Sequence, residues 1–515
     1  MSQTTQPLKN KLRRKILRIL GVTCGCLLVF TAFLLWYAAR WYADTYGQLG
    51  FEAILYTLLS DLGGVESNLI YDFIRTAAIP AVFWTAAVCL FLFTTWRKKL
   101  VLLVGKKFRL RLFPVRPMAA FFLSFTLSVG LLYQAADTSQ LIEYIRFMRQ
   151  ETAIYQEHYQ APNNITFPEE KRNLVYIYLE SMETTFFSRE QGGALDTCVI
   201  PELYDLAADN VNFSCTDQVG GMLCGSGACW TIAAMVTQTA GLPLKTPPDT
   251  DGNDYGVDGT FLPGTTTLMD VLHGSGYQQA LMVGSDAEFG GRDSYFSSHS
   301  VDNIYDLYTA RQDGLIPPDY KEWWGFEDAK LYLYAQQVLT EMASQEQPFA
   351  FYMLTADTHH IDGYVCSLCA ATHEKQYENV YSCASRQALA FVQWLQAQDF
   401  YENTTIVLVG DHPTMDNAYI QSVLPDENYT RYVYNCFINS AAIPAQTTNR
   451  ATYTIDMFPT VLAAMGCRIE GDRVGLGTNL FSATPTLAEV LGAEKFDIEL
   501  SKHSSYYTSR FFFAK

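Results

Sequence analysis

The chain has 515 residues, 49% of them hydrophobic and 17% charged, and a formal net charge of −17. This length allows one large domain together with a second part. The charge is uneven, because residues 1–136 carry 16 Lys and Arg against 5 Asp and Glu, whereas residues 137–515 carry 20 against 48. So acidic a second part argues against nucleic acid as a partner.

Three uncharged apolar runs lie near the N-terminus, at about residues 19–39, 76–96 and 117–136. Each has roughly 20 residues, the length that a helix needs to cross the hydrocarbon core of a bilayer. We therefore predict a membrane domain over residues 1–136 with three transmembrane helices. A signal peptide is the alternative for the first run, but that run is longer than the apolar region of typical signal peptides.

Basic residues predict how these helices are oriented. They gather before the first run and in the loop at 97–116, while the loop between the first two runs is poor in Lys and Arg. Because such residues stay in the cytoplasm, we expect a multi-pass protein with everything after Ala136 outside. Residues 51–64 are too short and too charged to span, and we expect an amphipathic helix along the outer membrane interface there.

Nine of the twelve cysteines follow residue 136. Outside the cytoplasm, cysteines form disulfide bonds more often than metal sites, so disulfides are the expectation, with one thiol left over from the odd count. Cys366 and Cys369 form a CxxC pair that could supply half of a zinc site, but no second CxxC completes it.

The remainder of the chain divides into a polar connector at residues 137–169 and a large domain at residues 170–515. Apolar runs of strand length alternate with helix-like segments in this domain. The strand-like runs are 173–180, 277–286, 348–360 and 405–412, and the helix-like segments include 230–240, 330–344 and 385–398. Buried strands that alternate with helices predict an α/β fold with a mainly parallel sheet flanked by helices.

Each predicted strand ends in polar residues. They are Glu180, then Ser285 and Asp286, then Thr358, His359 and His360, and finally Asp411 and His412. Because open α/β sheets bind ligands at the carboxyl ends of their strands, four such endings suggest one shared metal or phosphate site.

Glu180, Asp411 and His412 are the candidate metal ligands. Carboxylate oxygens and an imidazole nitrogen suit a hard or borderline divalent cation. Taken alone, Glu180 is better explained as a buried carboxylate that caps a helix. Together with the Gly-Asp-His sequence at 410–412, a metal site is favoured.

The segment GSGACWTIAAMV (225–236) offers a nucleophile. A loop of small residues turns there into an apolar helix, and the N-terminus of a helix attracts phosphate. Thr231 lies in the first turn, where a coordinated hydroxyl would be a usable nucleophile. Ser226 is the alternative nucleophile, or a helix cap, and the residues alone separate the two only weakly.

A phosphate also needs cationic and hydrogen-bonding partners. Arg292, in FGGRDSYF (289–296), could bind a phosphate through two donors, or could merely pair with Asp293. His359 or His360 could donate to a phosphate oxygen or protonate a leaving group. Asp293 and His360 are further candidates for substrate contact.

Taken in order, the motifs NLVYIYLES, GSGACWTIAAM, FGGRD, WWGFEDAKLY, FYMLTADTHH, VLVGDH and TIDMFPTVLAAMG resemble those of the alkaline phosphatase/sulfatase superfamily. The match is to its lipoteichoic acid synthase and phosphoglycerol transferase membrane enzymes of bacteria. It covers roughly residues 170–482. Two departures are that Gly290 and Gly291 stand where the lipoteichoic acid branch has a Trp, and that we count three spans where that branch has five.

The resemblance implies an extracytoplasmic catalytic domain with one divalent metal ion, bound by Glu180, Thr231, Asp411 and His412. Mn²⁺ is the usual ion in this family, with Mg²⁺ or Zn²⁺ as alternatives. Thr231 would take glycerol phosphate from phosphatidylglycerol, release diacylglycerol, and pass the group to a hydroxyl of a glycan or glycerol-phosphate polymer. Arg292 and His359 match the residues that contact the phosphate in this family.

Three other functions are alternatives to this one. A sulfatase would need a C/S-x-P-x-R motif, which is absent around Thr231. A phosphoethanolamine transferase shares the fold, the nucleophile and the metal, and is the main alternative. A non-catalytic membrane sensor or scaffold is disfavoured by the intact set of candidate site residues.

Overall fold

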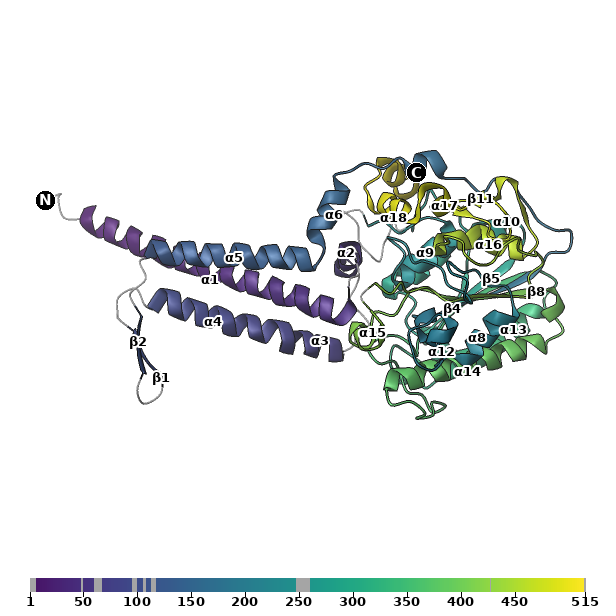
Figure 1. The fold of residues 1–515 in the computed structure, drawn as a ribbon, viewed down its shortest axis with the longest axis horizontal. Helices are drawn as coiled ribbons and strands as arrows, with labels where there is room; N and C mark the ends of the chain where they lie inside the picture. Colours follow the sequence, from purple (N-terminus) through teal and green to yellow (C-terminus); the bar gives the residue numbers. More distant parts are fainter. Residues whose placement is uncertain are drawn as a thin grey trace. The chain divides into compact units, whose positions relative to one another are not determined.

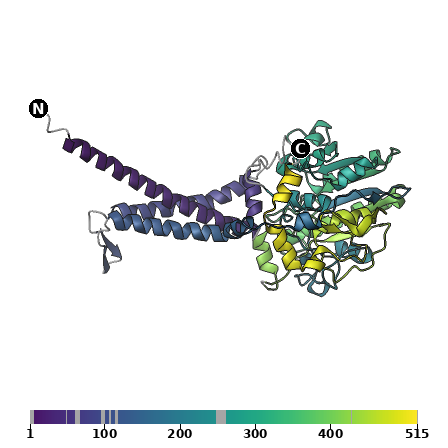
Figure 2. The same ribbon diagram turned by 90° about the horizontal axis from the view of Figure 1, so that it is seen from above.

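The computed structural model describes residues 6–47, 50–59, 67–94, 100–104, 108–112, 117–246, 260–426 and 428–513. The chain forms two compact units, one from residues 1–48 and 65–143 and the other from residues 49–64 and 144–515. Figures 1 and 2 show the long helices of the first unit and the layered second unit.

The first unit consists mainly of α1 (Gln6–Tyr46), α3 (Ser67–Phe73), the π-helical turn η1 (Ile74–Ala78), α4 (Ile79–Thr94) and α5 (Pro117–Thr138). Three helical stretches are long and apolar enough to cross a membrane: Ile19–Tyr46, Leu69–Phe91 and Met118–Thr138. They confirm the three predicted apolar helices. Residues 95–99, 105–107 and 113–116 lie outside the described residues, and β1 (Leu100–Val104) pairs antiparallel with β2 (Phe108–Leu112) between them.

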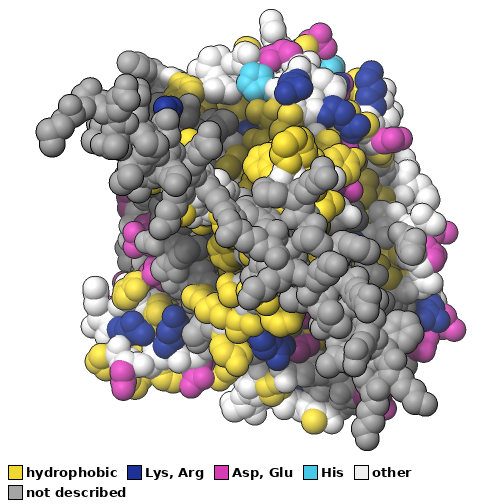
Figure 3. Space-filling model, turned by 90° about the vertical axis from the view of Figure 1, so that its left-hand side faces the viewer, with side chains coloured by type: hydrophobic (Ala, Val, Ile, Leu, Met, Phe, Trp, Pro, Cys, Tyr) yellow, Lys and Arg dark blue, Asp and Glu magenta, His cyan; other side chains and the backbone are white. Residues whose placement is uncertain are grey.

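Small side chains let these helices pack closely. Val29, Ala32 and Ala81 are fully buried in a cluster that α1, α4 and α5 share, as in other helix contacts within membranes. Large apolar side chains on the outer faces, such as Phe83 and Phe122, are exposed. Such exposure suits contact with lipid. Figure 3 shows hydrophobic side chains among charged and polar ones on one face of the molecule.

Helix α2 (Phe51–Leu59) lies between α1 and α3 in the sequence but belongs to the second unit. We expected an amphipathic helix along the membrane interface here. Tyr56 is only 4% exposed and packs in the core of the second unit, whereas Leu58 is 74% exposed. One side of α2 is thus buried against protein and the other is open. Residues 60–64 of the predicted segment lie outside the described residues.

A six-stranded sheet forms the centre of the second unit, in the order β6 (Asn303–Tyr305), β5 (Gln278–Val283), β7 (Phe349–Leu354), β4 (Asn173–Leu179), β8 (Thr404–Gly410) and β9 (Asn435–Ile438). The first five are parallel and β9 is antiparallel to β8. The predicted mainly parallel sheet is confirmed. The short edge strands β6 and β9 were not predicted.

Side chains alternate between the two faces of the sheet, as the two-residue period of a strand requires. Tyr176 and Tyr178 of β4 lie in one apolar cluster, and Val175 and Ile177 lie in the other. Helices cover both faces (Figure 1): α9 (Thr231–Ala240), α10 (Leu268–Gly274), α11 (Arg292–Ser298) and α16 (Met457–Ala464) on one, and α8 (Pro201–Asp209), α12 (Leu307–Gln312), α13 (Asp328–Ala343), α14 (Gln376–Gln396) and α15 (Asn417–Val423) on the other.

The remaining elements are short. They are α6 (Leu141–Met148), α7 (Ile154–His158), the antiparallel pairs β3 (Ile165–Thr166) with β10 (Arg468–Ile469) and β11 (Arg473–Val474) with β12 (Gly477–Thr478), and the C-terminal helices α17 (Leu487–Leu491), α18 (Ala493–Ser501) and α19 (Ser505–Tyr507). The C-terminal helices add to the same core cluster as α9 and α16.

An ion pair joins the loop after β4, which carries Glu183, to the segment between α15 and β9, which carries Arg431. Glu183 is fully buried, and Arg431 donates to both of its carboxylate oxygens, through Nε at 2.8 Å and through Nη2. The N–H of Thr414 also donates to Glu183 Oε1 at 2.9 Å, and Arg431 Nη2 donates to the Thr414 carbonyl at 2.7 Å. Charge-assisted bonds of this kind are among the stronger polar contacts in proteins.

We expect Glu183→Gln to lower the midpoint of thermal unfolding of the full chain in detergent markedly. The substitution removes the charge of the fully buried partner and weakens the hydrogen bonds that Arg431 and the Thr414 N–H make to it, and hydrogen bonds to charged groups contribute about 1.5–3 kcal/mol each. The matched control is Asp196→Asn, because Asp196 pairs with Arg189 at 3.0 Å while both side chains remain exposed, and exposed pairs contribute little. Equal shifts for the two variants would contradict this assignment.

Candidate active site

The carboxyl ends of β4 and β8 bring three metal-capable side chains together. One ligand atom each of Glu180, Asp411 and His412 lies within 4.8 Å of the others. His412 Nε2 is 3.8 Å from Glu180 Oε1 and 3.3 Å from Asp411 Oδ2, and all three residues are buried. Burial and the nearby Asp411 carboxylate raise the pKa of Glu180 well above its usual value. Two buried carboxylates side by side favour a neighbouring cation.

Hydrogen bonds orient these three side chains. The N–H groups of Ser181 and His412 donate to Asp411 Oδ1 at 2.7 and 2.8 Å, and Ser181 Oγ donates to Glu180 Oε1 at 2.7 Å. His412 Nδ1 lies 3.0 Å from the Pro413 carbonyl. A proton on Nδ1 that donates to this carbonyl leaves the lone pair of Nε2 facing the carboxylates, as in other imidazole metal ligands.

Close packing fixes the end of β8. A Cβ atom at Gly410 would lie 1.9 Å from the Met182 carbonyl oxygen, so this approach requires glycine. Gln238 on α9 donates from Nε2 to the Gly410 carbonyl at 3.1 Å and accepts from the Tyr176 hydroxyl at 2.8 Å. Gln238 therefore links α9 to the metal-capable end of β8.

The three residues fit a divalent cation. Asp411 Oδ2 is buried and has no hydrogen-bond partner among the described residues. A buried carboxylate oxygen without a partner is costly unless a cation or donor compensates it. Two carboxylates and one imidazole are suitable ligands for Mn²⁺, Mg²⁺ or Zn²⁺.

Thr231 adjoins this cluster at the N-terminus of α9. Trp230 is extended and the helix begins at Thr231, whose Oγ1 lies 3.4 Å from His412 Nε2. The first N–H groups of a helix have no partner within it, which makes this end suitable for an anion. A hydroxyl, a metal-capable cluster and an anion-attracting helix end thus meet at one point.

Ser226, the alternative nucleophile, is engaged elsewhere. Its N–H donates to Asp497 Oδ1 at 2.7 Å, and its Oγ accepts from Ser501 Oγ at 2.7 Å. Both partners lie on α18, so Ser226 fastens the loop before α9 to the C-terminal helices. The Thr231 hydroxyl therefore adjoins the metal-capable cluster, whereas the Ser226 hydroxyl contacts α18. The residues alone distinguished the two only weakly.

Arg292 is a buried cation at the start of α11. Gly290 and Gly291 precede it with φ of 70° and 73°, a left-handed backbone that glycine adopts without steric cost. Arg292 Nη2 donates to the Asp286 carbonyl at 2.6 Å and to Ser285 Oγ at 3.1 Å, while Nε has no partner among the described residues.

Burial lowers the pKa of the Arg292 guanidinium, and Glu180 opposes this shift, so the two charges lie within electrostatic range. Asp293 accepts from the Ser294 N–H at 2.6 Å and forms no ion pair with Arg292 in the described part of the chain. A buried guanidinium with a spare donor suits a phosphate oxygen.

The two histidines after β7 differ in their surroundings. His359 Nδ1 lies 2.8 Å from the His360 carbonyl, and the two rings stack with centroids 4.3 Å apart. Burial lowers the pKa of His359 to about 4 and that of His360 well below its usual value. A neutral His359 whose Nδ1–H donates to that carbonyl has a bare Nε2, which can accept a proton.

Sequence reasoning missed two tryptophans at the site. The Trp324 ring lies 4.7 Å from the ring of His359 and 5.4 Å from that of Phe289, and Trp230 directly precedes Thr231. Both indole N–H groups are buried without a partner among the described residues, although such groups usually find one. The Trp-Trp pair at 323–324 was the available sequence signal.

Helix α2 also reaches this region. The Tyr56 hydroxyl donates to the Gly290 carbonyl at 2.6 Å, and its ring lies 5.9 Å from that of Trp230. Glu52 accepts from the Thr246 N–H at 3.1 Å and lies 3.9 Å from Lys245 Nζ. The residues before Thr231 and Arg292 therefore both contact a helix from between the first two apolar stretches.

The twelve cysteines, all within the described residues, are free thiols. The structure thus contains none of the expected disulfides.

A family model described as Sulfatase matches residues 172–467. The chain therefore belongs to the Sulfatase family, within the alkaline phosphatase superfamily. The match spans β4 to the segment after α16, and so includes every strand end described above.

Curated relatives carry the name phosphoglycerol transferase I. One from Escherichia coli strain 55989 is 33% identical over 270 residues, which cover 51% of this chain and 33% of the relative. Another from Salmonella choleraesuis is 30% identical over 383 residues, covering 72% of this chain and 46% of the relative. The chain thus spans a third to about half of the length of these relatives.

Among solved structures, the integral membrane protein lipooligosaccharide phosphoethanolamine transferase A from Neisseria meningitidis matches with a TM-score of 0.51 and 12% identity. The match covers 93% of this chain and 87% of that chain. At this identity the likeness concerns the fold alone.

We expect Asp411→Asn and His412→Ala to weaken Mn²⁺ binding by more than about 100-fold, because altering groups that only support metal ligands already costs 10–100-fold. Calorimetric titration of metal-stripped protein in detergent measures this, and the rise in thermal midpoint on adding Mn²⁺ should vanish in parallel. His273→Ala, at an exposed position, is the control. Wild-type affinity in either ligand variant would refute the assignment.

Proposed function

We propose that this protein is a membrane-bound phosphoglycerol transferase. It takes glycerol phosphate from phosphatidylglycerol, releases diacylglycerol, and passes the group through a phosphoglycerol-threonine intermediate to a hydroxyl of a cell-envelope glycan or polymer. The observation that carries this proposal is the position of the Thr231 hydroxyl at the N-terminus of α9, where its Oγ1 lies 3.4 Å from His412 Nε2. The name of the curated relatives, phosphoglycerol transferase I, supports glycerol phosphate as the group that is transferred.

The reaction consists of two displacements at phosphorus. In the first, Thr231 Oγ1 bonds to phosphorus while the bond to the diacylglycerol oxygen breaks, and the threonine proton ends on diacylglycerol. In the second, the acceptor oxygen bonds to phosphorus, and Thr231 leaves and regains a proton. A covalent residue divides one difficult transfer into two easier ones.

Glu180, Asp411 and His412, with the Thr231 hydroxyl, would hold the divalent ion, which we propose to be Mn²⁺. When bound, such an ion lowers the pKa of the attacking hydroxyl and neutralises charge on the phosphate oxygens. The buried Asp411 Oδ2, which accepts no hydrogen bond from the described residues, supports this role.

Arg292 and His359 have separate tasks. Arg292 presents an unpaired Nε from a buried position, and donates to the charge that builds up on the phosphate oxygens. His359, neutral with Nε2 bare, takes the proton of the acceptor hydroxyl in the second displacement. The buried indole N–H groups of Trp230 and Trp324 are available to the glycerol headgroup, and Asp293 and His360 line its surroundings.

The three apolar helices support a location in a bacterial membrane, and the distribution of basic residues supports an extracytoplasmic second unit. A membrane-bound enzyme meets its lipid donor in two dimensions, and the polar acceptor approaches from the aqueous side.

The test is to incubate the full chain in detergent with Mn²⁺ and labelled phosphatidylglycerol. We expect diacylglycerol release and a phosphoglycerol mass adduct on the peptide that contains Thr231. Turnover and an adduct from phosphatidylethanolamine, with none from phosphatidylglycerol, would instead identify a phosphoethanolamine transferase. Absence of both would favour the non-catalytic sensor or scaffold.

We expect Thr231→Ala to abolish the adduct and lower release by about a thousandfold or more, as for other lost nucleophiles. Thr231→Ser keeps a hydroxyl and should retain part of the activity. Ser226→Ala is the matched control, since Ser226 bonds to α18. Should Ser226→Ala remove the adduct while Thr231→Ala keeps it, the nucleophile is wrongly assigned.

A further inference from the structure

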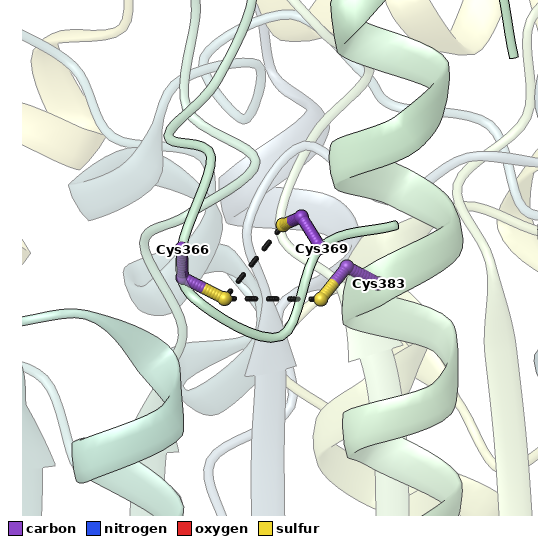
Figure 4. Close-up of side chains that lie close together, drawn as sticks. All are labelled: Cys366, Cys369 and Cys383. Atoms are coloured by element: carbon purple, nitrogen blue, oxygen red, sulfur yellow. Dashed lines mark hydrogen bonds between the residues drawn. The ribbon is translucent and has the colours of Figure 1, made fainter. Parts of the chain in front are cut away.

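Three thiols meet away from the candidate active site (Figure 4). Cys366 and Cys369 lie in the loop between β7 and α14, and Cys383 lies on α14. The Sγ atom of Cys366 is 3.6 Å from that of Cys369 and 3.8 Å from that of Cys383, and all three lie within 4.8 Å of one another. The fold thus adds a third cysteine to the CxxC pair, from a position that sequence spacing did not indicate.

These distances match the edges of a metal-centred tetrahedron. Zinc–thiolate bonds of about 2.3 Å in tetrahedral geometry place the sulfur atoms about 3.8 Å apart. A disulfide instead needs sulfur atoms about 2.05 Å apart. It would also use only two of the thiols and leave the third beside it, whereas a metal ion uses all three.

A fourth polar group faces the thiols. Gln387, one turn after Cys383 on α14, is 9% exposed, and its Nε2 lies 3.4 Å from Cys383 Sγ and 3.9 Å from Cys366 Sγ. Its Oε1 is buried with no hydrogen-bond partner among the described residues. Amide nitrogen and oxygen are interchangeable by rotation, and rotation would turn the unsatisfied oxygen toward the sulfur atoms.

An ion can reach the three thiols from outside the protein. Cys366 and Cys383 are buried and Cys369 is partly exposed, which leaves an entry path for an ion.

We propose that Cys366, Cys369 and Cys383 bind one Zn²⁺ ion, with the amide oxygen of Gln387 as the fourth ligand. The three thiols release their protons on binding, as metal–thiolate formation requires. With four protein ligands the site is closed and structural, not catalytic.

The ion would anchor the loop that carries His359. At its start this loop is held by Thr358, whose Oγ1 donates to the Glu180 carbonyl at 2.6 Å and whose carbonyl accepts from the Tyr377 hydroxyl on α14 at 2.7 Å. The zinc site would fasten the distal part of the loop to the same helix. Loss of zinc should therefore loosen the loop and expose it to proteolysis.

The test uses the full chain in detergent with the Asp411→Asn substitution, which removes the other metal-capable cluster. We expect about one equivalent of zinc by elemental mass spectrometry, in line with a single tetrahedral site. Replacement by Co²⁺ should give sulfur-to-cobalt charge-transfer absorption in the near ultraviolet, which oxygen and nitrogen ligands do not produce.

Cys369→Ser, at the partly exposed position, should abolish both signals and speed cleavage of the loop by added protease. Gln387→Leu should weaken zinc affinity about tenfold or more. Cys198→Ser, a partly exposed cysteine outside the cluster, is the matched control and should change neither signal.

The proposal is overturned if the Asp411→Asn protein holds no zinc and Co²⁺ gives no thiolate absorption. It is also overturned if peptide mapping after rapid alkylation finds Cys366 in a disulfide with Cys369 or Cys383. These outcomes do not depend on lipid turnover, so they are distinct from failure of the proposed transferase activity.

Discussion

The second unit is organised around two buried carboxylates that lie side by side because their strands are neighbours in the sheet. Glu180 and Asp411 end neighbouring parallel strands, and both are almost inaccessible to solvent. Like charges this close and this deeply buried are tolerated only with a cation or a proton between them. The surrounding structure supports this arrangement. Ser181 and His412 donate to Asp411, and Gly410 lets the backbones approach. Gln238 holds α9, the helix that begins at Thr231, to the same strand.

Parallel topology explains how distant segments reach one place. The strands β5, β7, β4 and β8 run in the same direction, so the residues after each of them emerge at one edge of the sheet. The Arg292 segment follows β5, His359 follows β7, Glu180 follows β4 and His412 follows β8. Residues more than 200 positions apart in the sequence, such as Ser181 and Asp411, thereby come within hydrogen-bonding distance.

Much of this could be predicted because it depends on local patterns. The four long strands are buried on both faces, so they appear in the sequence as continuous apolar runs with abrupt polar ends. What could not be predicted depends on tertiary contact. Cys383 joins Cys366 and Cys369 only because α14 packs beside their loop. Ser226 is kept from the metal-capable cluster by its contacts with α18, which the sequence does not indicate. The edge strand Asn435–Ile438 was too short to stand out from its surroundings.

The position of α2 has a practical consequence for biochemistry on isolated domains. Because Phe51–Leu59 belongs to the second unit, a soluble fragment that begins after the last apolar helix would lack a piece of its own core. Such a fragment would uncover the Trp230 ring beside Thr231 and free the Gly290 carbonyl beside Arg292. It would also leave the buried Lys245 ammonium without the Glu52 carboxylate. Weak or absent turnover by a truncated protein would then reflect the loss of these contacts. Supplying α2 as a separate peptide or a fused segment should restore the turnover.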